Sequence, residues 1–95
     1  MNSYELLYIV KADMEDEART ALISRFSDLI VADGGEIVET DEWGKRKFAY
    51  PINYVNEGYY VLVDFAADPQ LPRELERNFK NDESILRYMV TRKEA

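Results

Sequence analysis

The spacing of apolar residues changes along this chain, and that change constrains the fold more than any other feature of the sequence. Residues 4–10 (YELLYIV) combine β-branched and aromatic side chains, which is typical of a buried strand. We expect Asp13 to cap a following helix. Apolar side chains then recur three and four residues apart, at Ala18, Leu22, Phe26, Leu29 and Ile30. Gly34 and Gly35 favour the end of this helix, since glycine adopts the left-handed conformation without steric penalty.

Strand-like alternation begins at residue 36. Residues 36–50 predict one strand, interrupted by a bulge or kink at Gly44, and residues 59–66 (YYVLVDFA) predict the next. A polar, turn-rich tip at residues 53–58 separates the two strands. We therefore expect a long hairpin.

A second helix and a last strand complete the series. Asp68 and Pro69 predict the start of this helix, since aspartate favours the cap and proline the first turn. Its apolar residues lie four apart, at Leu71, Leu75 and Phe79. Residues 85–92 (ILRYMVTR) alternate again as a strand.

The predicted order is strand, helix, strand, strand, helix, strand, in a chain of 95 residues that has room for one domain over residues 1–95. Right-handed crossovers would place both helices on the same side of the sheet, with the first and third strands at its centre. We predict an α+β, ferredoxin-like βαββαβ sandwich, in which a four-stranded antiparallel sheet carries two helices on one face.

The sheet face without helices is the feature most relevant to function. We expect it to present Tyr60 and Leu62 from the third strand, with Arg87 and Met89 from the last strand. The opposite face of the third strand is expected to supply the core with Tyr59, Val61, Val63 and Phe65. An open sheet face with aromatic side chains needs a partner or must tolerate exposure.

The residue types that the chain lacks exclude most catalytic chemistry. With no Cys and no His, it has no disulfide, thiolate zinc site, cysteine nucleophile or imidazole base. It has no glycine-rich phosphate loop. No apolar run approaches the ~20 residues of a membrane-spanning helix, and no basic signal region opens the chain. We expect a soluble cytosolic protein that is not an enzyme.

The formal net charge of −7 argues against a protein that coats nucleic acid through bulk positive charge. Residues 1–40 hold three basic and nine acidic residues, whereas residues 41–95 hold nine basic and ten acidic residues. Two local groups of cations stand in the second part, Lys45 to Lys47 and Arg87 with Arg92 and Lys93. Taken alone, each group could equally be a solvated face or a protected sheet edge.

Residues 43–52 read Trp-Gly-Lys-Arg-Lys-Phe-Ala-Tyr-Pro-Ile, which resembles the signature of the bacterial small-subunit ribosomal protein number six family. Further similarity covers residues 3–93 in the correct order, at Tyr4-Glu5, Gly35, Gly58-Tyr59-Tyr60, Glu74-Leu75-Glu76 and the closing strand 85–90. The resemblance implies the ferredoxin-like fold. It also implies a structural protein of the small ribosomal subunit, which binds the central domain of 16S ribosomal RNA as a heterodimer with ribosomal protein number eighteen and helps to assemble the platform.

The resemblance further indicates which residues could form these two interfaces. Guanidinium and ammonium groups on the signature strand and the closing strand suit contacts to RNA phosphates. The candidates for RNA binding are Lys45, Arg46, Lys47, Arg87, Arg92 and Lys93. Aromatic, leucine and methionine side chains are candidates for the protein partner, because aromatic residues and methionine favour interface cores. These are Trp43, Phe48, Tyr60, Leu62 and Met89, with sheet packing as the alternative role of Phe48 and Tyr60. No cofactor, metal, small-molecule substrate or membrane partner is implied.

A different class of function remains as the alternative. A ferredoxin-like regulatory module that forms a homodimer and senses a small molecule, such as an amino acid, would also fit the acidity and the lack of catalytic residues. Such modules usually carry a glycine-bearing loop after the first strand. The segment from Lys11 to Met14 contains no glycine.

Overall fold

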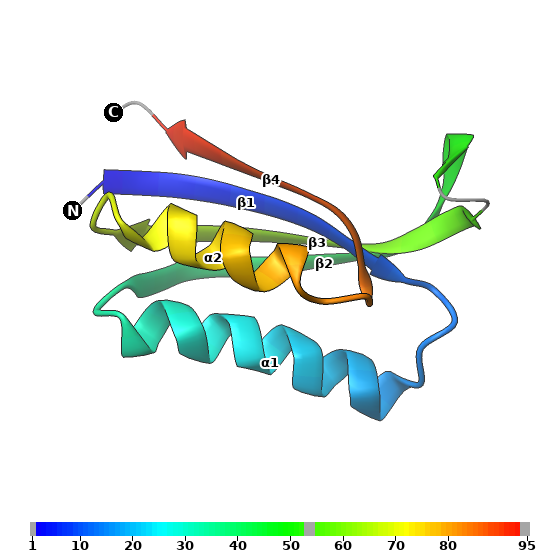
Figure 1. Ribbon diagram of the computed structural model, residues 1–95, viewed down its shortest axis with the longest axis horizontal. Helices are drawn as coiled ribbons and strands as arrows, with labels where there is room; N and C mark the ends of the chain where they lie inside the picture. Colours follow the sequence, from blue (N-terminus) through cyan, green and yellow to red (C-terminus); the bar gives the residue numbers. More distant parts are fainter. Residues whose placement is uncertain (1, 53–54, 94–95) are drawn as a thin grey trace.

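Six elements follow one another in the predicted order. The computed structural model describes residues 2–52 and 55–93. Its elements are β1 (Asn2–Lys11), α1 (Asp16–Ala32), β2 (Glu36–Ile52), β3 (Val55–Ala67), α2 (Leu71–Lys80) and β4 (Ile85–Lys93). The strands pair in the antiparallel order β2-β3-β1-β4, and both helices cover one face of the sheet (Figure 1). The predicted ferredoxin-like α+β architecture, with the first and third strands central, is confirmed.

The core lies between the sheet and the two helices. Alternate side chains of β1 and β3 are buried there, as the period of two in a strand requires. The strand residues are Tyr4, Leu6, Tyr8, Val10, Val61, Val63 and Phe65, and the helix residues are Leu22, Ile23, Phe26, Ile30, Leu71, Leu75 and Phe79. The expected core side of β3 is confirmed, with Tyr59 half-buried and packed at its margin.

Aromatic rings form the centre of this core. The ring centroids of Phe26 and Phe79 lie 4.3 Å apart, and that of Tyr8 lies 5.6 Å from the first and 5.3 Å from the second. The Tyr8 hydroxyl is buried and has no hydrogen-bond partner among the described residues. Burial, and to a lesser extent the charge of Glu42, raises the pKa of Tyr8 well above its ordinary value, since an ionised phenol would lose its hydration.

Helix α1 starts later than predicted and ends as predicted. Asp13 lies in the turn after β1 and does not cap the helix, so that prediction is wrong. The residue before the helix is Glu15, which makes no side-chain cap hydrogen bond. At the other end, Gly34 has a φ of +86° and the Gly35 amide donates to the Ile30 carbonyl at 2.9 Å. The end of the helix was predictable because the left-handed conformation favours glycine. The start was less predictable, because several neighbouring acidic residues could each serve as its cap.

Helix α2 also starts later than predicted. Asp68 precedes a turn, in which its carbonyl accepts a hydrogen bond from the Leu71 amide at 3.1 Å. The helix therefore begins at Leu71, and Pro72 rather than Pro69 occupies the first turn.

The hairpin of β2 and β3 extends past β1 as an arm, which we define as residues 45–52 and 55–58. Because β3 begins at Val55, the tip is shorter than the predicted turn at 53–58, and residues 53–54 lie outside the described part of the chain. Gly44 has a φ of +85° and stands at a register shift, which confirms the predicted bulge. The arm rises from the sheet on the side opposite the helices (Figure 1).

Candidate nucleic-acid and partner interface

The sheet face opposite the helices, here called the open face, is built of cross-strand rows. The first row is apolar and consists of Leu62, Leu7 and Met89, which lie opposite one another on β3, β1 and β4. The next row toward the arm consists of Tyr60, Ile9 and Arg87. Met89 is 58% exposed, so the apolar row reaches solvent at the β4 side. The open face presents the four side chains that the alternation predicted for it.

Two aromatic residues of β2 continue this apolar surface. The Trp43 ring lies nearly parallel to the Tyr60 ring, with centroids 6.1 Å apart and planes at 12°. The Phe48 ring lies 6.1 Å from Tyr60 at 50° on the arm side. The structure therefore brings all five partner candidates onto one face of the sheet: Trp43, Phe48, Tyr60, Leu62 and Met89.

Gly58 allows the arm to pack closely on the sheet. A Cβ atom at this position would lie 2.4 Å from Cγ2 of Ile9 and 2.8 Å from Cζ of Phe48. Both distances are shorter than carbon atoms tolerate. The Phe48 side chain of the arm and the Ile9 side chain of β1 thus meet over the space that a side chain on β3 would fill.

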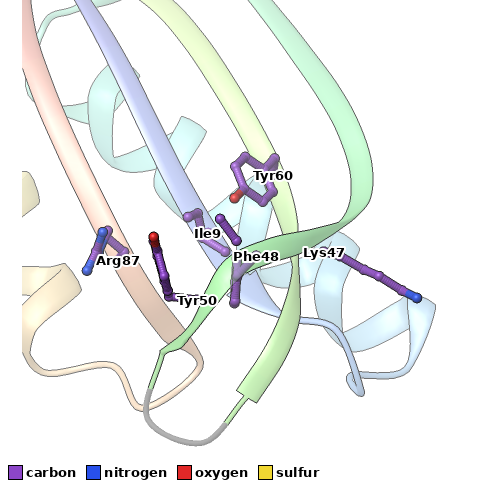
Figure 2. A pocket seen from close by; sticks show the side chains of 7 residues that line it. Ile9, Lys47, Phe48, Tyr50, Tyr60 and Arg87 are labelled. Carbon is purple, nitrogen blue, oxygen red and sulfur yellow. The ribbon is translucent and has the colours of Figure 1, made fainter.

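A hollow of about 330 Å³ lies between the arm and β4. Ile9, Phe48, Tyr60 and Arg87 line it, together with Tyr50, which is 82% exposed. Figure 2 shows Tyr50 and Arg87 on the same side of Phe48, although they come from opposite edges of the sheet. The ring of Tyr50 and the guanidinium of Arg87 are therefore both accessible to one ligand.

Four of the six RNA-binding candidates lie at this end of the sheet. The Arg46 guanidinium is 5.4 Å from the Trp43 ring centroid, which places it with the open face. Lys45 lies opposite Tyr59 in the register, so it belongs to the other face of the strand. Lys47 borders the hollow, with its ammonium group pointing away from Tyr50 (Figure 2). The three neighbouring cations of the signature therefore do not share one direction.

The two remaining candidates lie at the other end of β4. Lys93 is opposite Ser3 in β1, whereas Arg87 is opposite Ile9, six residues further along the same strand. At ~3.3 Å per residue, this separates Lys93 from Arg87 by about 20 Å along the sheet. The structure does not bring the predicted RNA-binding residues together into one patch.

Local polar groups already engage this second pair of cations. Arg92 donates a hydrogen bond to the side-chain oxygen of Asn2 at 3.1 Å. The Lys93 ammonium lies 3.2 Å from an Asp64 carboxylate oxygen, within ion-pair range but without hydrogen-bond geometry. Glu5 is directly opposite Asp64 on β1, so Lys93 also offsets repulsion between neighbouring carboxylates. A role within the protein thus competes here with phosphate binding.

Three residues that shape the apolar rows and the hollow were not among the candidates. Leu7 and Ile9 complete the cross-strand rows, and Tyr50 lines the hollow. The alternation within residues 4–10 could have identified the first two, because buried Tyr8 and Val10 direct their neighbours to the opposite face. Tyr50 belongs to the signature at residues 43–52 and shares a strand face with Phe48, but its position beside Arg87 depends on the bend of the arm.

On the helix side, Arg19 of α1 connects to the base of the hairpin arm. Its guanidinium lies 4.1 Å from the centroid of the Tyr59 ring and 2.6 Å from the Asp16 carboxylate. The Tyr59 hydroxyl donates to Glu42 at 2.9 Å. Burial and this contact with Glu42 raise the pKa of Tyr59. The network therefore fixes the side of the hairpin that faces away from the candidate interface.

Residues 2–52 and 55–93 contain neither a metal-binding cluster nor a membrane-spanning helix. No group of three or more acidic side chains is arranged to hold a metal ion. No helix is both long and apolar enough to cross a membrane.

Comparisons with known proteins agree with the resemblance of the signature strand. The family model "Ribosomal protein S6" matches residues 3–92. Small ribosomal subunit protein bS6 of Clostridium novyi is 49% identical to this chain over 94 residues, which cover 99% of both chains. The bS6 protein of Caldanaerobacter subterraneus is 51% identical over 92 residues, which cover 97% of both chains. The crystal structure of 30S ribosomal protein S6 from Thermotoga maritima matches with a TM-score of 0.93 and 32% identity, over 97% of this chain and 87% of that one. The chain therefore belongs to the ribosomal protein S6 family.

Proposed function

We propose that this protein is a structural, non-catalytic constituent of the small ribosomal subunit in the cytoplasm. It binds the central domain of 16S ribosomal RNA together with ribosomal protein number eighteen, during platform assembly and translation. The small-subunit relatives support the ribosomal role. The match to the S6 family gives no support to the alternative, a small-molecule sensor.

The observation that carries this proposal is the arrangement of the open face. An apolar surface around Trp43, Leu62 and Met89 adjoins the guanidinium groups of Arg46 and Arg87 on the same side of the sheet. An apolar patch next to a cationic one suits a protein and a polyanion bound side by side. With a net charge of −7, this chain alone attracts RNA weakly, and a basic protein partner would supply the missing positive charge.

A partner-dependent binding experiment tests the proposal. A central-domain fragment of 16S ribosomal RNA is titrated with this protein, with ribosomal protein number eighteen, and with both. We expect weak binding by this protein alone and much tighter binding with the partner present. Equal affinity of this protein with and without the partner would contradict the proposal.

Sedimentation of a cell extract supplies an independent check. On a sucrose gradient, the protein should migrate with small ribosomal subunits at low salt. A protein found only at the top of such a gradient, while other small-subunit proteins sediment normally, would count against a ribosomal role.

A further inference from the structure

We propose that the hollow between the arm and β4 binds a single unpaired nucleotide, with its base against the ring of Tyr50 and its phosphate on Arg87. This inference rests on the proposed function, because it names the part of the RNA that one section of the open face recognises. It also adds Tyr50 to the RNA-binding residues.

The lining of the hollow fits a ligand that is both aromatic and anionic. Phe48, Tyr50 and Tyr60 supply three aromatic rings, Ile9 supplies an apolar surface, and Arg87 supplies a guanidinium group. Lys47 adds a cation at the border, and none of the described residues that line the hollow carries a carboxylate. The volume of about 330 Å³ lies at the lower end of the ~300–1,000 Å³ typical of sites for small ligands. A nucleotide combines the two required properties in one unit.

Tyr50 is the residue best placed to stack on a base. Its side chain is 82% exposed, so its ring has lost little contact with water in the free protein. Unpaired bases stack on such rings whatever their identity, because every base has a π-face. A nucleotide in a duplex cannot enter in this way, since both faces of its base are already stacked. The hollow therefore favours a loop, a bulge or a single strand.

Packing beneath the arm gives the hollow a defined shape. Phe48 and Ile9 meet over Gly58, and Ile9 is only 6% exposed. These contacts join the arm to β1, so the distance between Tyr50 on the arm and Arg87 on β4 is set by packed side chains rather than by a free hairpin. A preformed site loses less conformational entropy when its ligand binds.

A protein segment is the competing occupant, because Phe48 and Tyr60 are also candidates for the partner interface. The charge of the hollow argues against it. The partner expected from the charge of this chain is basic, and it would meet Arg87 and Lys47 here, where no described lining residue supplies a carboxylate. Leu62 and Met89, which lie one row away from the hollow, suit the protein partner better.

The test uses the whole chain and short single-stranded RNA. Uridine and adenosine hexamers are titrated by NMR, with an abasic hexamer that keeps the phosphates as the reference. We expect backbone amide shifts at Ile9, Phe48, Tyr60 and Arg87, and stronger binding of either base-bearing hexamer than of the abasic one. Base stacking on an aromatic ring corresponds to about 5- to 150-fold in affinity. Tyr50→Ala should therefore weaken binding of the base-bearing hexamers at least fivefold, whereas Tyr50→Phe should stay within twofold of the unmodified protein.

Charge controls separate the phosphate contact from general attraction. Arg87→Gln should weaken binding of all three hexamers and lower the salt slope by about 0.7, as expected for one lost phosphate contact to a single strand. Arg73→Gln removes an equal charge from an exposed position on α2, on the helix side, and should leave the slope unchanged.

Three outcomes would overturn the inference: equal binding of the abasic and base-bearing hexamers, an affinity unaffected by Tyr50→Ala, or protection of the hollow by ribosomal protein number eighteen in the absence of RNA. If partner-dependent binding to the ribosomal RNA fragment persists in each case, only this inference fails. If that partner dependence is absent, the proposed function itself fails.

Discussion

Replacing Gly58 by alanine tests whether close packing holds the arm on the sheet. The added carbon would lie 2.4 Å from Cγ2 of Ile9, 2.8 Å from Cζ of Phe48 and 3.3 Å from the carbonyl oxygen of Val10. Ile9 is almost fully buried, so the Phe48 ring on the projecting arm has to move. Overpacking of this kind costs about 1–3 kcal/mol. Alanine also restricts the unfolded chain, which offsets about 0.4–1 kcal/mol, so we expect a net destabilisation of roughly 0.5–2 kcal/mol.

Urea and thermal unfolding followed by circular dichroism measure this change. One kcal/mol shifts the Tm of a domain of this size by about 4–8 °C, so Gly58→Ala should lower the Tm by several degrees. Because Trp43 is the only tryptophan and stacks on Tyr60, its emission reports whether the arm has moved. A Tm equal to or above that of the unmodified protein, with unchanged Trp43 emission, would refute the packing argument.

Gly35→Ala is a matched control for this experiment. A Cβ atom there would lie 2.8 Å from both Cγ2 and the carbonyl oxygen of Ile30, far along the sheet from the arm. It should also destabilise the fold, but it should leave Trp43 emission and binding of RNA hexamers unchanged. If both variants lose RNA binding equally, general destabilisation rather than displacement of the arm is the cause.

Four further changes address the interface and the core. Arg87→Ala should lower the affinity of the complex with ribosomal protein number eighteen for the ribosomal RNA fragment and reduce its salt slope by about one, and an unchanged slope would remove Arg87 from the interface. Met89→Glu should change the free energy of unfolding by less than about 0.5 kcal/mol, because its side chain is 58% exposed, yet weaken partner binding at least tenfold by calorimetry. Leu75→Ala should cost about 2–5 kcal/mol in urea unfolding, since Leu75 is fully buried against the sheet. Tyr8→Phe should reduce the loss of folding stability at alkaline pH. Because the folded-state pKa of Tyr8 is raised, its full contribution to the free energy of unfolding is present below the unfolded pKa of ~10. That contribution falls as pH rises above this value, by up to ~1.4 kcal/mol per pH unit. Equal alkaline slopes for Tyr8→Phe and the unmodified protein would contradict that assignment and point to Tyr59, whose pKa is also raised.

Much of the fold is determined locally. The period of two in residues 59–66 and the spacing of four between Leu71, Leu75 and Phe79 correctly predicted which side chains are buried. Gly34 and Gly44 marked a helix end and a bulge, because both adopt positive φ angles that other residues avoid. The helix starts were less predictable, because the residues that precede them, Glu15 and Gln70, make no side-chain cap hydrogen bond, so no cap signal in the sequence marks the start.

The candidate interface was predictable only in part. The sequence alone identified the family, the open face and the residue types that suit RNA and protein contacts. The tertiary structure decided their grouping: Arg92 and Lys93 lie five and six residues along β4 from Arg87, which corresponds to about 17 and 20 Å of strand. It also placed Tyr50 of the arm and Arg87 of β4 around one hollow, with the arm packed closely on the sheet where Gly58 has no side chain. Local spacing specifies which face of an element a residue occupies, whereas the distance between residues on different strands depends on register, strand order and packing, which form only when the sheet is assembled.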